Sequence, residues 1–537
     1  MADENVPVLV IGGGLTGLSA SVFLTHFGVR SLLVERHPDT SGHPKARAIN
    51  PRTMEIFRAV GMEDAIRAEE SPIAGNDVLV HVETLAGPER VRMPSAAPED
   101  LSRISPARWA MIDQNQLEPL LRKQAVATGA EVRFSTQLVS LEEDLDGVLA
   151  TVHDRSTGVT STIHANYVIA ADGSRSPVRR MLRVPDRGRG TITNLVSFFF
   201  HADLSPALAG RKVIAAYVNN PVVRGTLIPI DNEKRWVFNV SFYPEQGEGP
   251  EDFTERRCLE LLRSAIGVDD LPAEIEDGRM LPWEISMRIA EQFRAGRVFI
   301  AGDAAHVIPP TGAFGASTGI QDVYNLSWKL SLVLARAAGP GLLDTYGTER
   351  RPVALETAKQ AGLRFAVREG KRLEDVADEL VDETTMTFGY RYRSGAFSPQ
   401  FAEPAGPLLE DPDHPSAQPG ARAPHVIVQA KDGPEMSVVD LFGRGFVLFT
   451  TGAADSLAAA AAQTAGRLGV DLVAYRVGPD GDLTDPKGEW AARYKVGDDG
   501  VVLVRPDGFV GWRAAGAVPG TADLERALRQ LLDLGAA

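Results

Sequence analysis

The chain has 537 residues, 44% of them hydrophobic, so it is long enough for two or three domains with buried cores. Its net charge of −15 argues against a nucleic-acid partner, because affinity for phosphate backbones rests on clustered lysine and arginine. The lone cysteine, the acidic first residues and the lack of an apolar run of about 18 residues lead us to expect a cytoplasmic protein with no membrane partner.

The first segment predicts a dinucleotide-binding turn. Gly12, Gly14 and Gly17 form a Gly-x-Gly-x-x-Gly pattern between an apolar run and a helix-like stretch. Glycines permit the tight turn and the close approach of backbone to a pyrophosphate, which the helix N-terminus attracts. The next apolar run ends at Glu35, where a carboxylate can bind a ribose hydroxyl.

Along the chain, alternating strand and helix patterns predict a Rossmann-like α/β domain over residues 1–182, which resumes over 291–400. Between them, residues 183–290 show β-like runs and predict an inserted antiparallel sheet that binds substrate. Prolines in residues 401–424 predict a linker, and residues 425–537 show a compact α/β pattern.

Individual elements are expected within these ranges. Helices are predicted over residues 51–60, 116–128, 319–336 and 456–468, with a helix start between Gly315 and Gly319. Two buried strands, residues 167–171 and 298–301, lead into Asp172-Gly173 and Gly302-Asp303.

These motifs, together with Pro309-Pro310, Asn325-Leu326 and Trp328-Lys329-Leu330, resemble the group A flavoprotein aromatic hydroxylases, the family of phenol hydroxylase and para-hydroxybenzoate hydroxylase. Within that family the chain looks most like the bacterial aromatic-polyketide hydroxylases, and the resemblance covers essentially the whole sequence. It implies FAD, NADPH or NADH, and O2, with hydroxylation of a polycyclic aromatic polyketide through a flavin C4a-hydroperoxide in antibiotic biosynthesis. Since only one full glycine fingerprint is present, we expect the nicotinamide to bind without a domain of its own.

The resemblance also assigns cofactor contacts. It places Glu35 on the adenosine ribose, Arg36 near the adenine, Gln114 and Leu138 along the ADP part, and Asp303 on the ribityl chain. The complete set of expected cofactor-binding residues is Gly12, Gly14, Leu15, Thr16, Gly17, Glu35, Arg36, Arg47, Gln114, Leu138, Asp172, Gly173, Gly302, Asp303, Pro310, Gly312, Gly315, Ala316 and Ser317. No metal site is expected.

Two residues are expected to act at the flavin ring. The resemblance places Arg47 near the isoalloxazine, where it governs flavin position or nicotinamide reduction, although a plain surface arginine is the alternative. It brings the backbone at Pro310 against the ring. Ala313 and Ser317 stand where the family usually has glycine and asparagine. His306 is expected to make structural hydrogen bonds rather than to act as a base.

A large flat substrate requires apolar walls. Tyr217, Phe238 and Trp283 are the expected substrate-binding residues of the inserted domain. Trp236, Phe238 and Val240 alternate along the chain, so we expect their side chains on one face of a sheet. The alternative is that this face belongs to the ordinary hydrophobic core and does not contact substrate.

The C-terminal region resembles a thioredoxin-like domain without Cys-x-x-Cys, which excludes a redox role and leaves packing or homodimer formation. Other functions stay open: Baeyer–Villiger or ring-cleaving oxygenation, inactivation of an antibiotic, or a flavin-binding protein that sequesters a drug without turnover.

Overall fold

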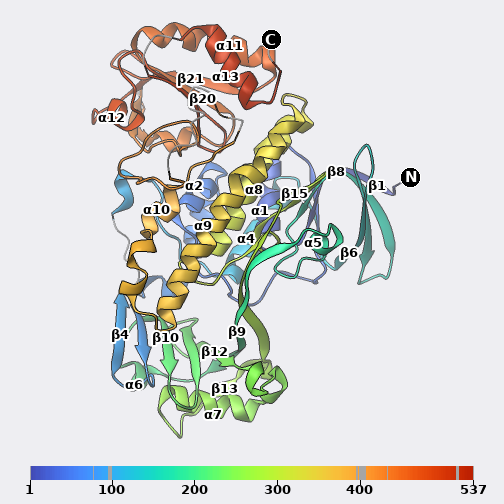
Figure 1. Cartoon of the computed structure of the whole chain (residues 1–537), viewed down its shortest axis with the longest axis vertical. Helices are drawn as coiled ribbons and strands as arrows, with labels where there is room; N and C mark the ends of the chain where they lie inside the picture. The colour runs from blue at the N-terminus through green and yellow to red at the C-terminus, as the bar shows by residue number, and fades with distance from the viewer. Residues whose placement is uncertain are drawn as a thin grey trace.

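The protein is described by a computed structural model over residues 2–76, 78–94, 100–394, 397, 407–431, 433–515 and 519–535. Three bodies follow one another along its long axis, with the C-terminal domain at one end and a sheet of green and blue strands at the other (Figure 1). The long helices α8 (Phe314–Leu334) and α9 (Thr345–Arg368) lie in the central body. No described helix is both long enough and apolar enough to cross a membrane.

The central body is built on a mostly parallel sheet in the order β15-β16-β8-β1-β2-β5, with β7 also paired to β8 and β6 paired to β7. Its strands are β1 (Glu4–Ile11), β2 (Ser31–Val34), β5 (Glu131–Arg133), β6 (Thr136–Glu143), β7 (Val148–Asp154), β8 (Thr160–Ala170), β15 (Arg294–Ala295) and β16 (Val298–Ile300). Its helices, besides α8 and α9, are α1 (Leu15–His26), α2 (Pro51–Ala59), α3 (Glu63–Ala68), α4 (Gln114–Ala127), α5 (Pro177–Met181) and α10 (Glu383–Phe388). Because β16 pairs with β8 in parallel, this domain is discontinuous in sequence, as predicted.

The second sheet has the order β17-β14-β9-β12-β11-β10-β3-β4, with β13 beside β9. Its strands are β3 (Val78–Val82), β4 (Glu89–Pro94), β9 (Asp186–His201), β10 (Val213–Asn219), β11 (Arg224–Pro229), β12 (Arg235–Phe242), β13 (Glu274–Ile275), β14 (Leu281–Ala290) and β17 (His306–Val307). The predicted antiparallel sheet is therefore present, but β3 and β4 come from the range assigned to the first domain, and β3 runs parallel to β10.

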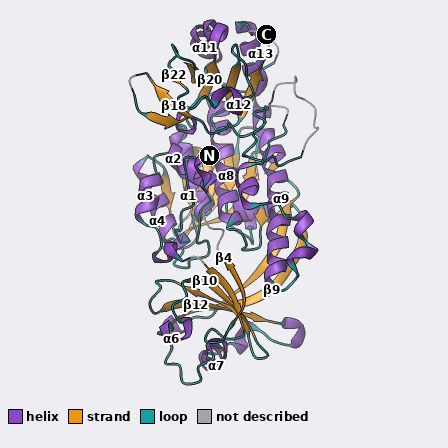
Figure 2. Ribbon diagram, turned by 90° about the vertical axis from the view of Figure 1, so that its left-hand side faces the viewer, coloured by secondary structure: helices purple, strands orange, loops and turns teal. Residues whose placement is uncertain are grey.

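One face of the second sheet packs against α7 (Glu255–Ile266), and α6 (Ser205–Leu208) lies nearby at the same end of the molecule (Figure 2). The apolar side of α7, which includes Cys258 and Leu262, is buried against Phe198 and Trp236. This packing leaves the opposite face of the sheet to turn toward the central body.

The C-terminal domain contains a four-stranded sheet in the order β21-β20-β23-β24. Strands β20 (Phe446–Thr450) and β21 (Leu472–Arg476) are parallel and joined by α11 (Asp455–Leu468), whereas β23 (Val501–Val504) and β24 (Val510–Ala514) are antiparallel and precede α13 (Thr521–Leu531). This is the arrangement expected of a thioredoxin-like domain. A small sheet of β18 (Ile427–Ala430), β19 (Glu435–Ser437) and β22 (Leu483–Thr484), with α12 (Trp490–Tyr494), completes it.

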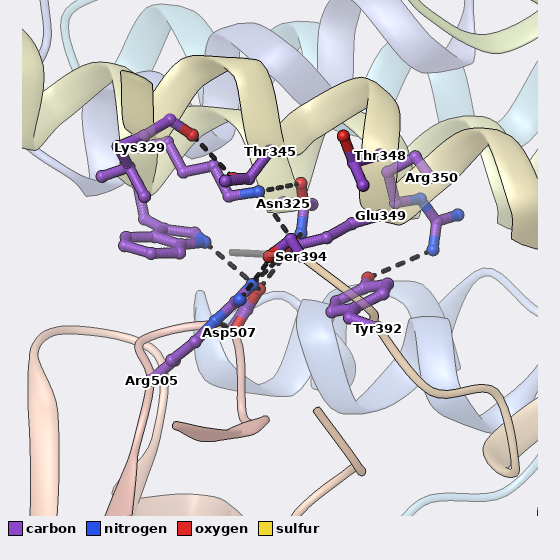
Figure 3. A network of polar contacts seen from close by, with 12 residues as sticks. Asn325, Lys329, Thr345, Thr348, Glu349, Arg350, Tyr392, Ser394, Arg505 and Asp507 are labelled. Atoms are coloured by element: carbon purple, nitrogen blue, oxygen red, sulfur yellow. Dashed lines mark hydrogen bonds and ion pairs between the residues drawn. The ribbon is translucent and has the colours of Figure 1, made fainter. Parts of the chain in front are cut away.

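A network of buried ion pairs joins this domain to the central body (Figure 3). Arg505, just after β23, donates to both carboxylate oxygens of Glu349 on α9 at 2.8 and 2.9 Å and also binds Asp507. Glu349 also pairs with Lys329 of α8 at 2.8 Å, and the Trp328 indole donates to Asp507 at 3.2 Å. The side chains of Arg505, Glu349 and Lys329 are fully buried, so the two domains meet through charges that must stay paired.

The described part of the predicted linker packs against the protein. Residues 401–406 lie outside the described residues, whereas Ala417, Ala421 and Arg422 are buried against the neighbouring domains. Arg422 donates to Glu55 of α2, so this segment packs into the domain junction.

Candidate active site

A cavity of ≈ 2460 Å³ lies between the carboxyl ends of the first sheet and the inner face of the second. Pockets for one small molecule usually measure about 300–1,000 Å³, so this cavity has room for more than one ligand. One lobe follows the glycine turn after β1, and the other follows the second sheet and the end of α9.

The glycine turn is formed as predicted. Gly12 has a φ of +108°, and a Cβ placed there would lie 2.3 Å from the carbonyl oxygen of Ala171. A Cβ at Gly17 would lie 1.9 Å from the carbonyl oxygen of Gly12, so Gly17 serves helix–strand packing and does not line the cavity. Gly14, Leu15 and Thr16 line the cavity at the start of α1, where backbone N–H groups suit a pyrophosphate.

The turn after β16 meets the same helix. A Cβ at Gly302 would lie 2.3 Å from Thr16 Oγ1, and one at Gly319 of α8 would lie 2.6 Å from it. Gly302 therefore permits contact between α1 and the Gly302-Asp303 turn rather than facing the cavity. Two motifs that are far apart in the sequence are adjacent in the fold.

Glu35 directly follows β2 at the rim of the first lobe. Its carboxylate accepts from the backbone N–H groups of Gly13 at 2.6 Å and His37 at 2.8 Å, which orients it across the glycine turn. Arg36, Gln114 and Leu138 line this lobe as well. The ADP-side residues are thus brought together.

Glu118 on α4 is a cavity residue that the sequence reasoning missed. It accepts from Gln114 Nε2 at 2.7 Å and from the backbone of Ser41 at 2.8 Å, and burial raises the pKa of its carboxyl. Nothing in its local sequence distinguishes it from an ordinary helix carboxylate.

Asp172 and Gly173 line the cavity, and Asp172 also closes the turn into α5. Its carboxylate accepts from the Ser176 hydroxyl and from the Val178 N–H at 2.9 Å, and burial raises its pKa. Arg179 of α5 then donates to the carbonyl oxygen of Ala304. The Asp172-Gly173 motif is therefore connected to the Gly302-Asp303 turn through α5.

Asp303 points into the cavity, and no described residue donates a hydrogen bond to its side chain. Burial raises the pKa of this carboxyl, while the charges of His306 and Lys45 act in the opposite direction. The carboxylate is open to the cavity and has no protein donor, so it can accept hydrogen bonds from a ligand that carries hydroxyl groups.

His306 faces away from the cavity. Its Nε2 lies 2.6 Å from Asp322 Oδ2, and Arg350 donates to the other oxygen of Asp322 at 2.8 Å. The imidazole is fully buried in this cluster, so its geometry gives it a structural role.

Arg47 crosses from the central body to the second sheet. Its guanidinium makes two hydrogen bonds to the carboxylate of Asp113, at 2.7 and 3.1 Å, and a third to the carbonyl oxygen of Pro229 at 2.6 Å. The side chain lines the cavity and is only 16% exposed, which excludes the surface alternative.

The loop before α8 forms the wall between the two lobes. Pro310, Gly312, Gly315 and Ala316 line the cavity. Ser317 does not line it, which corrects the expectation: its side chain is fully buried, and its oxygen accepts from the Asn50 N–H at 3.2 Å. A helix turns by about 100° per residue, so the position after Ala316 faces α2 instead.

α8 begins at Phe314, one residue before the start expected between Gly315 and Gly319, and it directly follows Gly312 and Ala313, whose φ angles are positive. The glycines that follow weaken the helical signal in the sequence.

The three residues expected to bind substrate lie on both faces of the second sheet. Tyr217 and Trp283 line the cavity. Phe238 does not: it is fully buried, and its ring lies 5.7 Å from that of Phe198 on the α7 side. Since side chains alternate along a strand, the stripe that includes Trp236 is core, and its odd-numbered neighbours face the cavity.

Arg368, at the end of α9, is a second residue that was missed. It donates to the carbonyl oxygen of Pro310 at 3.1 Å, and its guanidinium lies 5.5 Å from the ring centroid of Tyr217. The sequence alone does not predict this contact, because an arginine at the end of an amphipathic helix is expected to be exposed to solvent.

A Rossmann-like sheet with a glycine turn, a cavity carboxylate without a protein donor and a second ligand lobe are features of a dinucleotide-dependent enzyme. Residues 5–361 match the family described as FAD binding domain, and residues 416–534 match the aromatic-ring hydroxylase C-terminal domain. The chain therefore belongs to the FAD-dependent aromatic-ring hydroxylases, which confirms the family expected from its motifs.

Relatives match along their whole lengths. Tetracenomycin A2 monooxygenase-dioxygenase from Streptomyces glaucescens is 41% identical over 538 residues, covering 96% of this chain and 94% of that protein. Aklavinone 12-hydroxylase from Streptomyces purpurascens is 40% identical over 541 residues, covering 99% and 100%. A solved ternary complex of aklavinone-11 hydroxylase with FAD and aklavinone is 39% identical with a TM-score of 0.90, covering 99% and 100%, and confirms the fold class.

Proposed function

We propose that this enzyme uses NADPH or NADH and O2 to hydroxylate a polycyclic aromatic polyketide in antibiotic biosynthesis. The observation that carries the proposal is the second lobe of the cavity, in which one open sheet face with Tyr217 and Trp283 lies next to the loop at Pro310. The names of the relatives support the substrate class, since they act on tetracenomycin and aklavinone.

FAD, when bound, supplies the acceptor for hydride and the activation of oxygen. The chain holds it at several points. The turn at Gly12 and the start of α1 receive the pyrophosphate, Glu35 the adenosine ribose and Asp303 the ribityl hydroxyls. Pro310 and Gly312 present backbone to the ring.

Arg47 and Pro310 are the residues that we assign to the reaction itself. The bonds of Arg47 to Asp113 and to the Pro229 carbonyl hold its loop against the second sheet, which sets the distance between flavin and substrate lobes. The bond from Arg368 to the Pro310 carbonyl ties the end of α9 to the loop before α8. Exclusion of water from the reacting atoms would favour transfer of oxygen to the substrate over loss as hydrogen peroxide.

The wider organisation is part of the proposal. We place FAD binding in residues 1–182 and 291–400, substrate binding in 183–290 together with strands β3 and β4, and packing in 425–537. A homodimer and a cytoplasmic location without membrane or nucleic-acid partners are proposed from the family resemblance, the single cysteine and the charge of −15.

The test is NADPH oxidation by the FAD-loaded enzyme with anthracycline-, angucycline- and naphthoquinone-type polyketides, followed by product mass. We expect stimulated oxidation and a gain of one oxygen with the ring skeleton intact. The same gain with an opened ring or a lactone would replace hydroxylation by Baeyer–Villiger chemistry. An absence of stimulation with every compound would contradict the proposed substrate class.

The matched variant for this test is Asp303→Ala. It removes the carboxylate without touching the second lobe, so it should lower FAD content and affinity by at least tenfold while the affinity of the folded protein for polyketide changes little. An Asp303→Ala protein that retains FAD like the wild type would refute the assigned role of Asp303.

A further inference from the structure

The cavity face of the second sheet carries a row of polar side chains, none of which is among the residues assigned to the cofactor. Ser197, Asn239, Thr226, Tyr217 and His81 are direct cross-strand partners on β9, β12, β11, β10 and β3. Directly opposed residues share a face, so the row crosses the floor of the substrate lobe at right angles to the strands.

The hydrogen bonds at one end of this row determine the orientation of Asn239. The Trp283 indole N–H, which can only donate, donates to Ser197 Oγ at 2.6 Å. Ser197 is 1% exposed, so its own proton needs a protein acceptor, and it donates to Asn239 Oδ1. If the amide were reversed, the hydroxyl proton would be buried without an acceptor, which is costly.

The carboxamide NH2 of Asn239 is therefore held away from Ser197, at the cavity surface. No described residue accepts a hydrogen bond from it, and Asn239 lines the cavity. Its cross-strand neighbour Thr226 lines the cavity too. The result is an oriented donor in the floor of a lobe that Tyr217 and Trp283 also line.

We propose that Asn239 is a specificity-determining residue that donates a hydrogen bond to a carbonyl oxygen of the aromatic substrate, with Trp283 and Ser197 fixing its orientation. The inference rests on the proposed function, because it deepens the choice of substrate to polycycles that carry a quinone or ketone oxygen. A site built to donate a hydrogen bond discriminates against an analogue without the acceptor, since the buried donor is then unpaired.

The test is the affinity of the full-length, FAD-loaded enzyme for two probes, a dihydroxyanthraquinone and a dihydroxyanthracene that lacks the carbonyl oxygens. Binding is followed by the change in flavin absorbance. Asn239→Leu removes the donor, and Asn239→Asp replaces it with an acceptor of the same shape. We expect each variant to bind the anthraquinone about tenfold or more weakly, without weakening the dihydroxyanthracene.

Ser241→Ala is the matched control, because Ser241 lies on the same strand and lines the same cavity outside the Trp283–Ser197–Asn239 chain. It should bind both probes as the wild type does. FAD content and thermal unfolding establish that each variant is folded.

The inference is overturned if both Asn239 variants bind the anthraquinone like the wild type, or if both probes weaken equally. If the wild type binds both probes and is stimulated by polyketides, but the Asn239 variants bind the probes as the wild type does, only the role of Asn239 is overturned. A wild type that binds neither probe and is not stimulated would overturn the proposed function as well.

Discussion

Ala313 is a residue held in an unfavourable backbone conformation at the edge of the cofactor lobe. Its φ is +51°, in the left-handed region, and it directly precedes α8. This conformation costs an L-residue with a Cβ about 1–2 kcal/mol, whereas glycine adopts it freely. Where the family usually has glycine, this chain thus carries local strain next to the loop at Pro310.

Ala313→Gly should relieve that strain. Allowing for the extra freedom of glycine in the unfolded chain, we expect a gain of about 0.5–1 kcal/mol in unfolding free energy, measured by thermal and urea unfolding of the FAD-loaded protein. Ala316→Gly is the control: this alanine lies within α8, so its replacement should lower stability by about 1 kcal/mol. Equal losses from both changes would contradict the account.

At the scale of the element, the two sheets show which part of the site a sequence can predict. Gly12 and Gly302, which follow strands of the first sheet, were predictable, because a close approach by neighbouring atoms selects glycine wherever the motif lies. The face of the sheet on which Phe238 lies could not be predicted. Alternation shows that a strand has two faces, but it does not show which face α7 covers. Ser317 and Arg368 were misjudged or missed for the same reason, since tertiary packing alone decides where they point.

Phe238→Leu and Phe199→Leu separate the two faces. Phe238 lies in the core under α7, so its change should cost about 1 kcal/mol of stability and leave polyketide affinity intact. Phe199 pairs with Val237 and lines the cavity, so Phe199→Leu should weaken polyketide binding and change stability little. Urea unfolding and probe titration measure the two effects, and a loss of affinity in Phe238→Leu would place its ring at the substrate.

For the molecule as a whole, the charged junction in Figure 3 makes the C-terminal domain a structural partner of the FAD site. Arg505 pairs with Glu349, whose neighbour Arg350 binds Asp322, and Asp322 in turn accepts from the Gly302 N–H at 3.2 Å. The turn that carries Asp303 is thus connected through buried contacts to a hairpin in another domain.

Arg505→Met tests this junction. It leaves Glu349 facing Lys329 and Asp507 with a buried charge unbalanced, so we expect a loss of about 3–5 kcal/mol and a lower FAD content. Arg526→Met, which removes one partner of an exposed ion pair with Asp523, should have no measurable effect on either. A fully stable, FAD-replete Arg505→Met protein would show that the two domains are energetically independent.

The pairing of β1 with β8, and of β8 with β16, also has a consequence for how the protein is made. Strand β1 ends at Ile11, and β16 does not begin until Val298, so the first sheet cannot close until nearly 300 further residues have left the ribosome. At about 5–20 residues per second, that wait lasts on the order of tens of seconds. Until then β8 lacks its neighbour β16 and the Gly302-Asp303 turn has not been made, so we expect FAD to be loaded late in the biogenesis of the enzyme.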